Sequence, residues 1–226
     1  MGRLFVDGVP SIGVNFALGT TKGISIADNS VLRPETNSIF TWCAWVKLFN
    51  TVENVLPRIL AKGSHYTCIM GDKTNGQYRR MALEVGGDNG SGVVEYWGTT
   101  RLSFHRWYFL ATVFDTGTCQ HYVNAVAETM NVISGPFVAP LASSSANALL
   151  IGNSSGNSRN WPGVIAGAKV FNAALTAAQI LQLFKGQEIS TDNQLNMKLN
   201  EGNGTSVADS SSNGFTGTIT AAGWGN

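Results

Sequence analysis

The amino-acid sequence predicts an all-β protein, a sandwich of sheets with one short helix laid on its side. Two features of composition favour strands and turns over helices. Only 13% of the residues are charged, and the 226-residue chain holds 26 glycines among many Ser, Thr and Asn residues. The third observation is that short apolar runs recur along the chain with turn signals between them. A hydrophobic fraction of 43% is enough for a sizeable core.

Strands are expected, in chain order, at residues 13–18, 23–27, 39–49, 57–62, 66–70, 79–85, 92–97, 106–115, 119–124, 126–132, 147–152, 163–171, 194–199 and 215–220. The most informative is "RWYFLATVFD" at 106–115, because its two alternating sets of residues are both largely apolar. A strand with two apolar faces is covered on both sides, or lies central in a sheet packed under loops. We therefore expect a central strand with 119–124 as its hairpin partner.

One helix is expected near 177–185, in "LTAAQILQLFKG". Thr176 is the predicted N-cap and Gln179, three residues later, completes a capping box. Leu175 and Ile180 flank the cap as a hydrophobic staple, and Gly186 suits the position after the helix end. A single short helix among many strands indicates a sandwich with a helix on its side.

The chain is expected to form one domain, residues 1–226. No shift in composition marks a boundary, and the polar segments 141–148 and 153–160 are too short to be linkers. No repeat with a solenoid period is visible.

Composition and charge exclude several functions. With a net charge of +1 and no basic stripe, the chain has no field to attract nucleic acid or an anionic membrane. No run is long enough to span a bilayer, and the first residues lack the apolar core of an export signal. The odd set Cys43, Cys68 and Cys119 is a poor disulfide framework, so folding in a reducing compartment is expected, with Cys43 as a buried thiol.

Two segments carry a family resemblance. "HRWYFLATVFDTGTCQHYVNA" (105–125) and "ALLIGNSSGNSRNWPGVIAGAKVFNAALTAAQILQLF" (148–184) resemble, together with "FTWCAWVKL" (40–48), the laminin G-like domains of the concanavalin A-like lectin and glucanase superfamily. This resemblance implies a two-sheet antiparallel jelly-roll sandwich.

The resemblance has departures. Ala125 stands where the family usually has Gly, Ala166 replaces an Asp, and Gln179 replaces a Glu. The segment 195–224 looks like the one that usually opens such a domain, yet here it closes the chain. We therefore expect 195–224 to close the sheets, with Trp224 near the 14–18 strand, or else to complete a neighbouring subunit by exchange.

Catalytic motifs of the superfamily's glycanases are not found. Their E-x-D-x-E strand motif is missing, and the closest acids are four residues apart, Glu84 with Asp88 and Glu188 with Asp192. Acids distant in sequence can still meet in space, so this argues against one enzyme family only. The sequence thus predicts no enzyme, and no catalytic residue is assigned.

Two further motifs are weak. "GNSSG" (152–156) has the spacing of a nucleophile elbow around Ser154, but "NSRNWPG" follows it where a helix is required. The histidines His65, His105 and His121 lack the spacing of zinc ligands. Neither motif supports a catalytic centre.

A calcium site is one interpretation of "DSSSNG". Asp209, Ser211 and Asn213 are spaced as in the first half of an oxygen-ligand loop. Related sandwiches often carry structural calcium near such a loop, so the resemblance suggests this cofactor. The alternative is an Asx-turn that leads into a strand.

Aromatic residues beside loops are the candidate ligand contacts. Trp97 and Trp161 can stack on a sugar or anchor a protein interface, with Arg159 and Asn160 next to Trp161. The alternative for Trp161 is a lid that closes the end of the sandwich.

The function expected from these observations is a non-catalytic binding or structural module that presents loops to a glycan or a protein. A neutral, Ser/Thr/Asn-rich chain without an export signal suggests a phage virion protein, such as a head decoration, fibre or tail-associated module. Its partners would then be other virion subunits, and a homo-oligomer is a further expectation. The alternatives are a secreted carbohydrate-binding module and a glycan hydrolase or lyase on the same fold.

Overall fold

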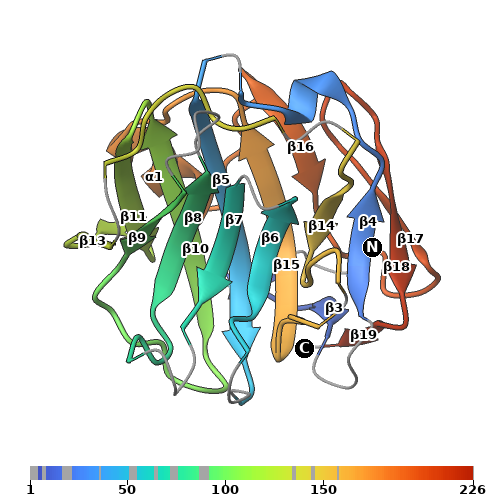
Figure 1. Cartoon of the computed structure of the whole chain (residues 1–226). Helices are drawn as coiled ribbons and strands as arrows, with labels where there is room; N and C mark the ends of the chain where they lie inside the picture. Colours follow the sequence, from blue (N-terminus) through green and yellow to red (C-terminus); the bar gives the residue numbers. More distant parts are fainter. Residues whose placement is uncertain are drawn as a thin grey trace.

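The computed structural model shows two antiparallel sheets stacked face to face (Figure 1). It describes residues 5–6, 9–16, 22–35, 37–50, 55–63, 66–71, 76–86, 92–133, 136–143, 146–156 and 158–225. The front sheet, nearer the viewer in Figure 1, has the strand order β13-β9-β8-β7-β6-β14-β4-β18-β17. The back sheet has the order β12-β11-β10-β5-β15-β3-β19, with β16 also paired to β15.

The strands of the front sheet are β4 (Gly23–Ile26), β6 (Arg58–Lys62), β7 (Tyr66–Met70), β8 (Met81–Gly86), β9 (Val93–Trp97), β13 (Asn131–Ile133), β14 (Leu149–Ile151), β17 (Ser206–Ala208) and β18 (Thr216–Thr220). Those of the back sheet are β3 (Gly13–Asn15), β5 (Ile39–Leu48), β10 (Trp107–Asp115), β11 (Thr118–Val123), β12 (Val126–Ala127), β15 (Gly163–Phe171), β16 (Asn193–Met197) and β19 (Gly223–Gly225). Outside them lie the pair β1 (Phe5–Val6) and β2 (Val9–Pro10), the 3-10 turn η1 (Ser30–Leu32) and helix α1 (Ala177–Phe184).

The main core fills the space between the sheets. Phe40 of β5, Phe114 of β10 and Tyr66 of β7 meet there, with ring centroids 5.1 to 5.3 Å apart in the two contacts that Phe40 makes. Alternation along each strand turns every second residue into this space. The predicted sandwich is therefore confirmed. The hydrophobic fraction of 43% supplies the apolar side chains that fill the space between the two sheets.

Strand β10 is covered on both faces, as its sequence predicts. It lies between β5 and β11 and forms a hairpin with β11. Leu110 points into the main core, while Phe109 on the other face packs under α1, 5.9 Å from the ring of Phe184. The crowded aromatics of this segment thus serve two separate apolar layers.

Helix α1 begins as predicted. The Thr176 hydroxyl accepts a hydrogen bond from the Gln179 backbone N–H, and the Gln179 side chain accepts one from the Thr176 backbone N–H. Ile180 and Leu175 are buried together against the back sheet. After the helix, Gly186 adopts a positive φ of 76°, which a glycine accepts without strain.

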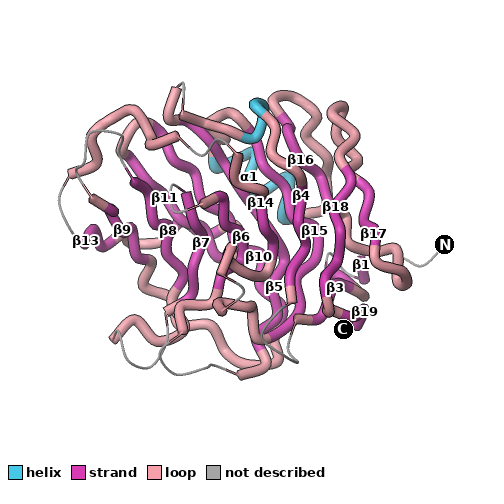
Figure 2. The backbone as a smooth tube through the Cα atoms, turned by 45° about the vertical axis from the view of Figure 1, so that its right-hand side comes forward, coloured by secondary structure: helices cyan, strands magenta, loops and turns pink. Residues whose placement is uncertain are grey.

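The C-terminal segment contributes strands to both sheets. Figure 2 shows β18 beside β4 and β19 beside β3. Trp224 is the register partner of Val14, as predicted, but the 216–220 strand pairs with 23–26 rather than with the N-terminal strand. All of these pairings lie within one chain.

Three expectations about strands are corrected. Residues 126–132 form two short strands, β12 and β13, in different sheets, because the chain crosses from one sheet to the other between them. Strands β17 and β19 were not expected, since each is only three residues long and rich in small or polar residues. The expected 13–18 strand ends at Asn15, and its residues 17 and 18 lie outside the described part.

The cysteines and the single described helix agree with the sequence analysis. Cys43, Cys68 and Cys119 are free and buried, and burial raises the pKa of Cys43 to about 12. Among the described residues, none of the helices has the length and apolar character needed to cross a membrane.

The turn after β11 carries the alanine that departs from the family pattern. Asn124 and Ala125 both have positive φ, 51° and 63°, between the register partners Val123 and Val126. A two-residue hairpin of this kind favours Asn-Gly, because a Cβ in the left-handed region costs on the order of 1 kcal/mol. We expect Ala125→Gly to raise the free energy of unfolding by about 1 kcal/mol in urea titrations. The control Ala127→Gly, at an exposed strand position, should lower it.

A buried histidine links the two sheets. His121 of β11 is fully buried; its Nδ1 lies 2.7 Å from the Thr112 hydroxyl and its Nε2 lies 2.8 Å from the Tyr96 carbonyl oxygen in the front sheet. Burial lowers the pKa of His121 from 6.5 to about 4, with the Tyr96 carbonyl opposing the change. The neutral ring is therefore part of the folded structure.

This histidine predicts a pH dependence of stability. The folded pKa lies below the unfolded one, so its contribution is complete above about pH 6.5 and is lost as the pH falls toward 4. Linkage puts the loss at about 3 kcal/mol. We expect urea midpoints to fall between pH 7 and pH 4.5 and to fall much less in His121→Gln. An equal fall in both proteins would contradict the assignment.

Candidate functional site

A row of mostly polar side chains crosses the outer face of the front sheet. In β4, Ile24 and Ile26 are buried in the core, so Ser25 between them lies on the opposite face. The register partners of Ser25 continue the row across the neighbouring strands: Thr218, Leu150, Ala61, Thr67, Glu84 and Glu95. Because partners in register share a face, these side chains line one surface.

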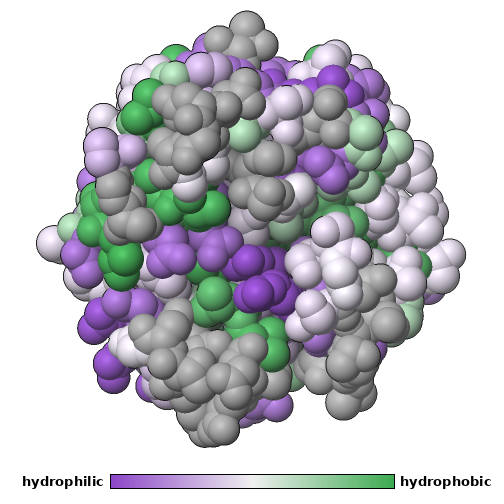
Figure 3. Space-filling model, viewed as in Figure 1, coloured by the Kyte–Doolittle hydropathy of each residue, from purple (hydrophilic) through white to green (hydrophobic). Residues whose placement is uncertain are grey.

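Two adjoining clefts lie over this row. The larger has a volume of about 460 Å³ and is lined by Arg58, Ala61, Gly63, Thr67, Glu84, Val93, Glu95, Ser154, Ser155, Gly156, Ser158 and Arg159. The smaller has a volume of about 340 Å³ and is lined by Gly23, Ser25, Gly63, Asn147, Ala148, Leu150, Asn153, Ser155 and Thr220. They share Gly63 and Ser155, and we call them together the front-sheet groove. Figure 3 shows strongly hydrophilic residues at the centre of this face.

The loop 152–160 forms one wall of the groove and is held from beneath. Asn153 is fully buried; its Nδ2 donates to the Lys22 carbonyl, and its Oδ1 accepts from the backbone N–H groups of Ser154 and Arg159. The Arg159 carbonyl in turn accepts from the Arg58 N–H. Ser154 therefore lies in a loop that the Asn153 side chain holds, and no helix directly follows it among the described residues, which argues against a nucleophile elbow.

An ion pair lies at the centre of the larger cleft. Arg58 Nη2 is 2.9 Å from Glu84 Oε2, and both side chains are nearly buried, with exposed fractions of 10% and 14%. Burial raises the pKa of Glu84, which Arg58 opposes, and burial also lowers the pKa of Arg58. The Nη1 of Arg58 is buried without a hydrogen-bond partner. A ligand in this cleft would meet a charged, hydrogen-bonded pair of side chains.

A second carboxylate lies beside the ion pair. Glu95 is the register partner of Glu84 on the neighbouring strand, so their side chains are on the same face. Facing Cβ atoms in antiparallel strands are about 5 Å apart. The indole N–H of Trp97 donates to Glu95 Oε2 at 2.8 Å, which fixes the carboxylate. Two glutamates and two arginines thus line the cleft, and carboxylate and guanidinium groups are hydrogen-bonding partners for hydroxyl groups.

The fold has known counterparts. A family model described as the Concanavalin A-like lectin/glucanases superfamily matches residues 18–181. The chain belongs to this superfamily. No curated protein sequence matches it.

Two solved structures have a fold similar to that of this superfamily member. A candidate carbohydrate binding protein from Bacteroides ovatus ATCC 8483 superposes with a TM-score of 0.75 at 18% identity, over 95% of this chain and 59% of that one. The chain therefore spans only 59% of the length of the Bacteroides protein. The heptameric SAP-like pentraxin of Limulus polyphemus superposes with a TM-score of 0.59 at 15% identity, over 96% of this chain and 98% of that one. At such identities the likeness shows the fold alone.

The expectation that Trp97 and Trp161 contact a ligand is wrong. Trp161 is 0% exposed and Trp97 is 1% exposed, and a ring without an open face cannot stack on a sugar. Trp161 closes the main core and donates from Nε1 to the Lys47 carbonyl at 3.2 Å, as the lid alternative has it. Trp97 packs against Ile69 and Ala82 and acts on the groove only through Glu95.

The two polar candidates next to Trp161 have different surroundings. Arg159 lines the larger cleft, so a role in ligand binding stays a prediction for it. Asn160 donates from Nδ2 to the Phe16 carbonyl at 3.2 Å, which ties the loop to the sheet beneath. Asn160 therefore supports the wall of the groove.

Sequence reasoning missed the glutamate pair. Proximity in sequence pairs Glu84 only with Asp88, which lies outside the described residues, while its cross-strand partner Glu95 is eleven positions away. A signal existed, because "MALEV" and "VVEYW" flank the turn-forming "GGDNGSG" almost symmetrically. A hairpin centred on that turn places the two glutamates opposite each other.

The predicted calcium loop forms an Asx-turn in which the carboxylate is fully engaged. Asp209 Oδ1 accepts from the backbone N–H groups of Asn196 and Ser211, both at 2.8 Å. Asp209 Oδ2 accepts from the Ser211 hydroxyl at 2.6 Å and from the Phe215 N–H at 3.1 Å. In this arrangement Asp209, Ser211 and Asn213 do not fit calcium, because no carboxylate oxygen is free for it.

Within the described ranges, no group of three or more His, Cys, Asp or Glu residues could hold a metal ion. Calcium binding at the 209–213 loop is thus suggested by the family resemblance alone, and the side-chain arrangement does not support it.

The loop gives a prediction that separates the two interpretations. We expect Asp209→Ala to lower the free energy of unfolding by about 2 kcal/mol, because it removes four hydrogen bonds and leaves the Asn196 N–H without an acceptor. A chelator should leave the melting temperature of the wild type unchanged. Asp115→Ala, at an exposed carboxylate, is the matched control. A melting temperature that rises with added calcium in the wild type, but not in Asp209→Ala, would restore the metal.

Proposed function

We propose that the chain is a non-catalytic glycan-binding module whose ligand lies in the front-sheet groove. The observation that carries this proposal is the lining of the groove, where hydroxyl, amide, carboxylate and guanidinium groups converge on one open face. Sugar hydroxyl groups both donate and accept, so mixed polar linings of this kind suit them. The Bacteroides protein of similar fold, a candidate carbohydrate binding protein, adds support.

The groove is preorganised for such a ligand. Its floor is a hydrogen-bonded sheet, and its wall is fixed by the buried Asn153 side chain. Small floor residues such as Ala61 and Gly63 leave room for sugar rings, and Leu150 offers an apolar surface to their C–H groups. A rigid site loses little entropy when it binds, which favours measurable affinity for a polar ligand.

A binding experiment tests the proposal. The wild type is screened against a panel of polysaccharides by affinity electrophoresis, and hits are measured by calorimetry. Ser155 is exposed and lines both clefts, so Ser155→Trp should fill their junction and abolish binding. Ala178→Trp, at an exposed position of α1 on the other sheet, is the matched control and should bind as the wild type does. Binding that survives Ser155→Trp would place the ligand elsewhere.

The Glu84–Glu95 pair favours a second candidate, a glycan hydrolase or lyase. Glycosidases place two carboxyl groups about 5 to 10 Å apart, one of them with a raised pKa, and the pKa of Glu84 is raised by burial. Against this, Arg58 holds Glu84 and Trp97 holds Glu95. New reducing ends or unsaturated products that disappear in Glu84→Gln would establish the enzyme.

The place of this module on a phage particle is a separate proposal from sequence. It predicts that the protein co-purifies with virions together with other particle subunits. A homo-oligomer is part of the same expectation, and native mass measurement tests it. Glycan binding by the groove does not depend on either outcome.

A further inference from the structure

A second cavity lies on the opposite side of the sandwich, where the end of α1 meets β15 and β16. It has two adjoining parts that share Glu188, Asn196 and Lys198, and we call them together the α1 cleft. The narrow part, of about 20 Å³, is walled by Trp45, Phe109 and Leu183. The wide part, of about 210 Å³, is lined mainly by Ser, Asn and charged side chains.

The narrow part is shaped for a methyl group. A cavity of about 20 Å³ holds one water-sized group, and an apolar lining disfavours water. Gly167, with φ of 57°, lies where the pairing of β15 with β5 shifts its register between Ala166 and Lys169. A bulge of this kind redirects side chains, and the glycine leaves a corner that a Cβ would fill, 3.7 Å from Cδ1 of the Trp45 ring.

The wide part has one positive charge without a partner. Lys169 Nζ lies 2.6 Å from Glu188 Oε2 and 2.8 Å from Asn196 Oδ1, and Asn196 Nδ2 also donates to Glu188. Lys169, Glu188 and Asn196 are therefore hydrogen-bonded to one another. Lys198 has no acidic partner within 4 Å among the described residues, although its backbone carbonyl is fixed by the Gly167 N–H. The cleft therefore offers one uncompensated cation.

The wall of the wide part adds polar side chains. Asn193 is only 7% exposed, and its Oδ1 is a buried acceptor without a donor. Ser210 and Ser212 line the same cavity and are exposed. A ligand here can accept hydrogen bonds from serine hydroxyl groups beside a lysine.

We infer that the α1 cleft binds a small monoanionic sugar acid that carries an acetyl group. The carboxylate pairs with Lys198, the polar body fills the wide part, and the acetyl methyl enters the apolar corner between Trp45 and Leu183. One unpaired cation beside the carboxylate of Glu188 matches a single negative charge and disfavours a phosphate, which carries nearly two. This site is independent of the front-sheet groove.

Four small sugars, and N-acetylglucosamine 6-phosphate as a fifth compound, test the inference by calorimetry. N-acetylmuramic acid has both groups, glucuronic acid only the carboxylate, N-acetylglucosamine only the acetyl group, and glucose neither. We expect the first to bind at least about tenfold more tightly than any of the others, as a charged hydrogen bond is worth. Equal binding of N-acetylglucosamine, tighter binding of its 6-phosphate, or no binding of N-acetylmuramic acid at millimolar concentration would overturn the assignment.

Variants locate the site. Lys198→Met should reduce the affinity for N-acetylmuramic acid to that for N-acetylglucosamine, and Lys198→Arg should retain most of it, while thermal melts confirm that both variants fold. Ser155→Trp, in the front-sheet groove, should leave this binding unchanged. Loss of binding in Ser155→Trp, or unchanged binding in Lys198→Met, would show that the compound binds elsewhere and would leave the proposed function of the groove untouched.

Discussion

Deletion of residues 193–226 is expected to leave a chain that does not fold to a soluble monomer. The deleted segment supplies β18, which lies between β4 and β17 in the front sheet, and β16, which pairs with β15 in the back sheet. Five of its apolar side chains are buried in the main core: Leu195, Met197, Leu199, Val207 and Ile219. At about 2 kcal/mol each, their loss is on the order of 10 kcal/mol, comparable with the whole stability of a typical domain.

The deletion also opens a sheet edge. Without β18, the backbone groups of β4 that face it lose their partners, although β14 still pairs with the other side, and an unpaired edge invites other chains. Size-exclusion chromatography and thermal melts are the measurements. The control is deletion of 223–226, which removes β19 alone and should give a folded, somewhat less stable protein. A soluble monomer of Δ193–226 that melts with the full chain would show that the segment is not needed for closure.

The register supplies a crosslinking test that decides between closure and exchange. Ser25 and Thr218 are cross-strand partners, so cysteines at both positions should form a crosslink within one chain. The native cysteines are buried and should not interfere. Disulfide-linked dimers on a non-reducing gel would instead support exchange between neighbouring subunits. The sequence alone predicts that segment 195–224 lies near residues 14–18, and the register shows that β19 is the strand that pairs there.

Features that depend on neighbours in sequence could be predicted, and those that depend on distant contacts could not. The capping box at Thr176 and Gln179 is local chemistry, and the structure has it as expected. The two apolar faces of β10 follow from alternation within nine residues. In contrast, the burial of Trp161 depends on Lys47, 114 positions away, so a tryptophan beside Pro and Gly looked like a surface residue.

The same distinction explains the candidate site. Arg159 was found because it stands in a polar loop next to an aromatic residue. Arg58 and Glu95 were missed because only their contacts with Glu84 mark them as site residues. Arg58 forms an ion pair with Glu84, and Glu95 is its partner in strand register. The sequence predicts which side chains share a face within one strand. Which strands are neighbours, and so which of these faces line one groove, depends on the order of strands in the sheet.

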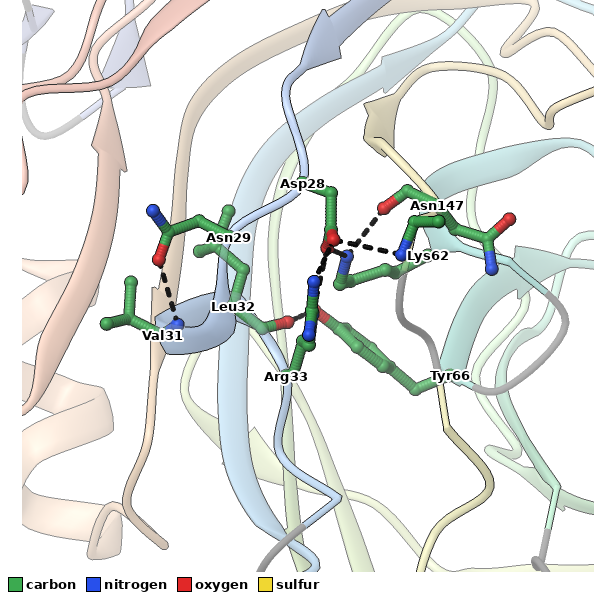
Figure 4. Close-up of polar contacts among 9 residues, drawn as sticks. Asp28, Asn29, Val31, Leu32, Arg33, Lys62, Tyr66 and Asn147 are labelled. Atoms are coloured by element: carbon green, nitrogen blue, oxygen red, sulfur yellow. Dashed lines mark hydrogen bonds and ion pairs between the residues drawn. The ribbon is translucent and has the colours of Figure 1, made fainter.

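Asp28→Asn is expected to lower the free energy of unfolding by about 3 to 5 kcal/mol, because it leaves a buried lysine without its counter-charge. Lys62 of β6 is 0% exposed, and its Nζ lies 2.5 Å from Asp28 Oδ1 and 2.6 Å from the Asn147 carbonyl oxygen (Figure 4). Arg33 Nε donates to the same Asp28 oxygen at 3.0 Å, and the Ala146 N–H donates to the other at 2.9 Å. One carboxylate thus joins segments more than a hundred residues apart.

The charges in this cluster determine how strongly each variant lowers the free energy of unfolding. Asparagine has nearly the shape of aspartate but no charge, and its amide N–H groups would face the donors of Lys62 and Arg33. Lys62→Met removes the buried cation and leaves Asp28 paired with Arg33, so it should be less damaging. In the double variant Asp28→Asn/Lys62→Met the loss should be smaller than the sum of the two, because no buried charge remains alone. Asp115→Asn, at an exposed carboxylate, is the control and should change stability by less than about 0.5 kcal/mol.

The pH dependence gives an independent test of the same cluster. The hydrogen bond from Arg33 comes first among the causes that hold the pKa of Asp28 far below its usual 3.8; burial opposes it, and Lys62 adds to it. A depressed folded pKa means that the contribution is complete above about pH 4 and is lost only as the pH falls further toward the folded value. The stability difference between wild type and Asp28→Asn should therefore be full at pH 7 and at pH 5, and smaller at pH 2.5. This window lies below that of His121, so urea titrations at these three values separate the two groups. A difference under 1 kcal/mol at pH 7, or one that does not shrink at pH 2.5, would show that Asp28 does not hold Lys62 in the folded protein.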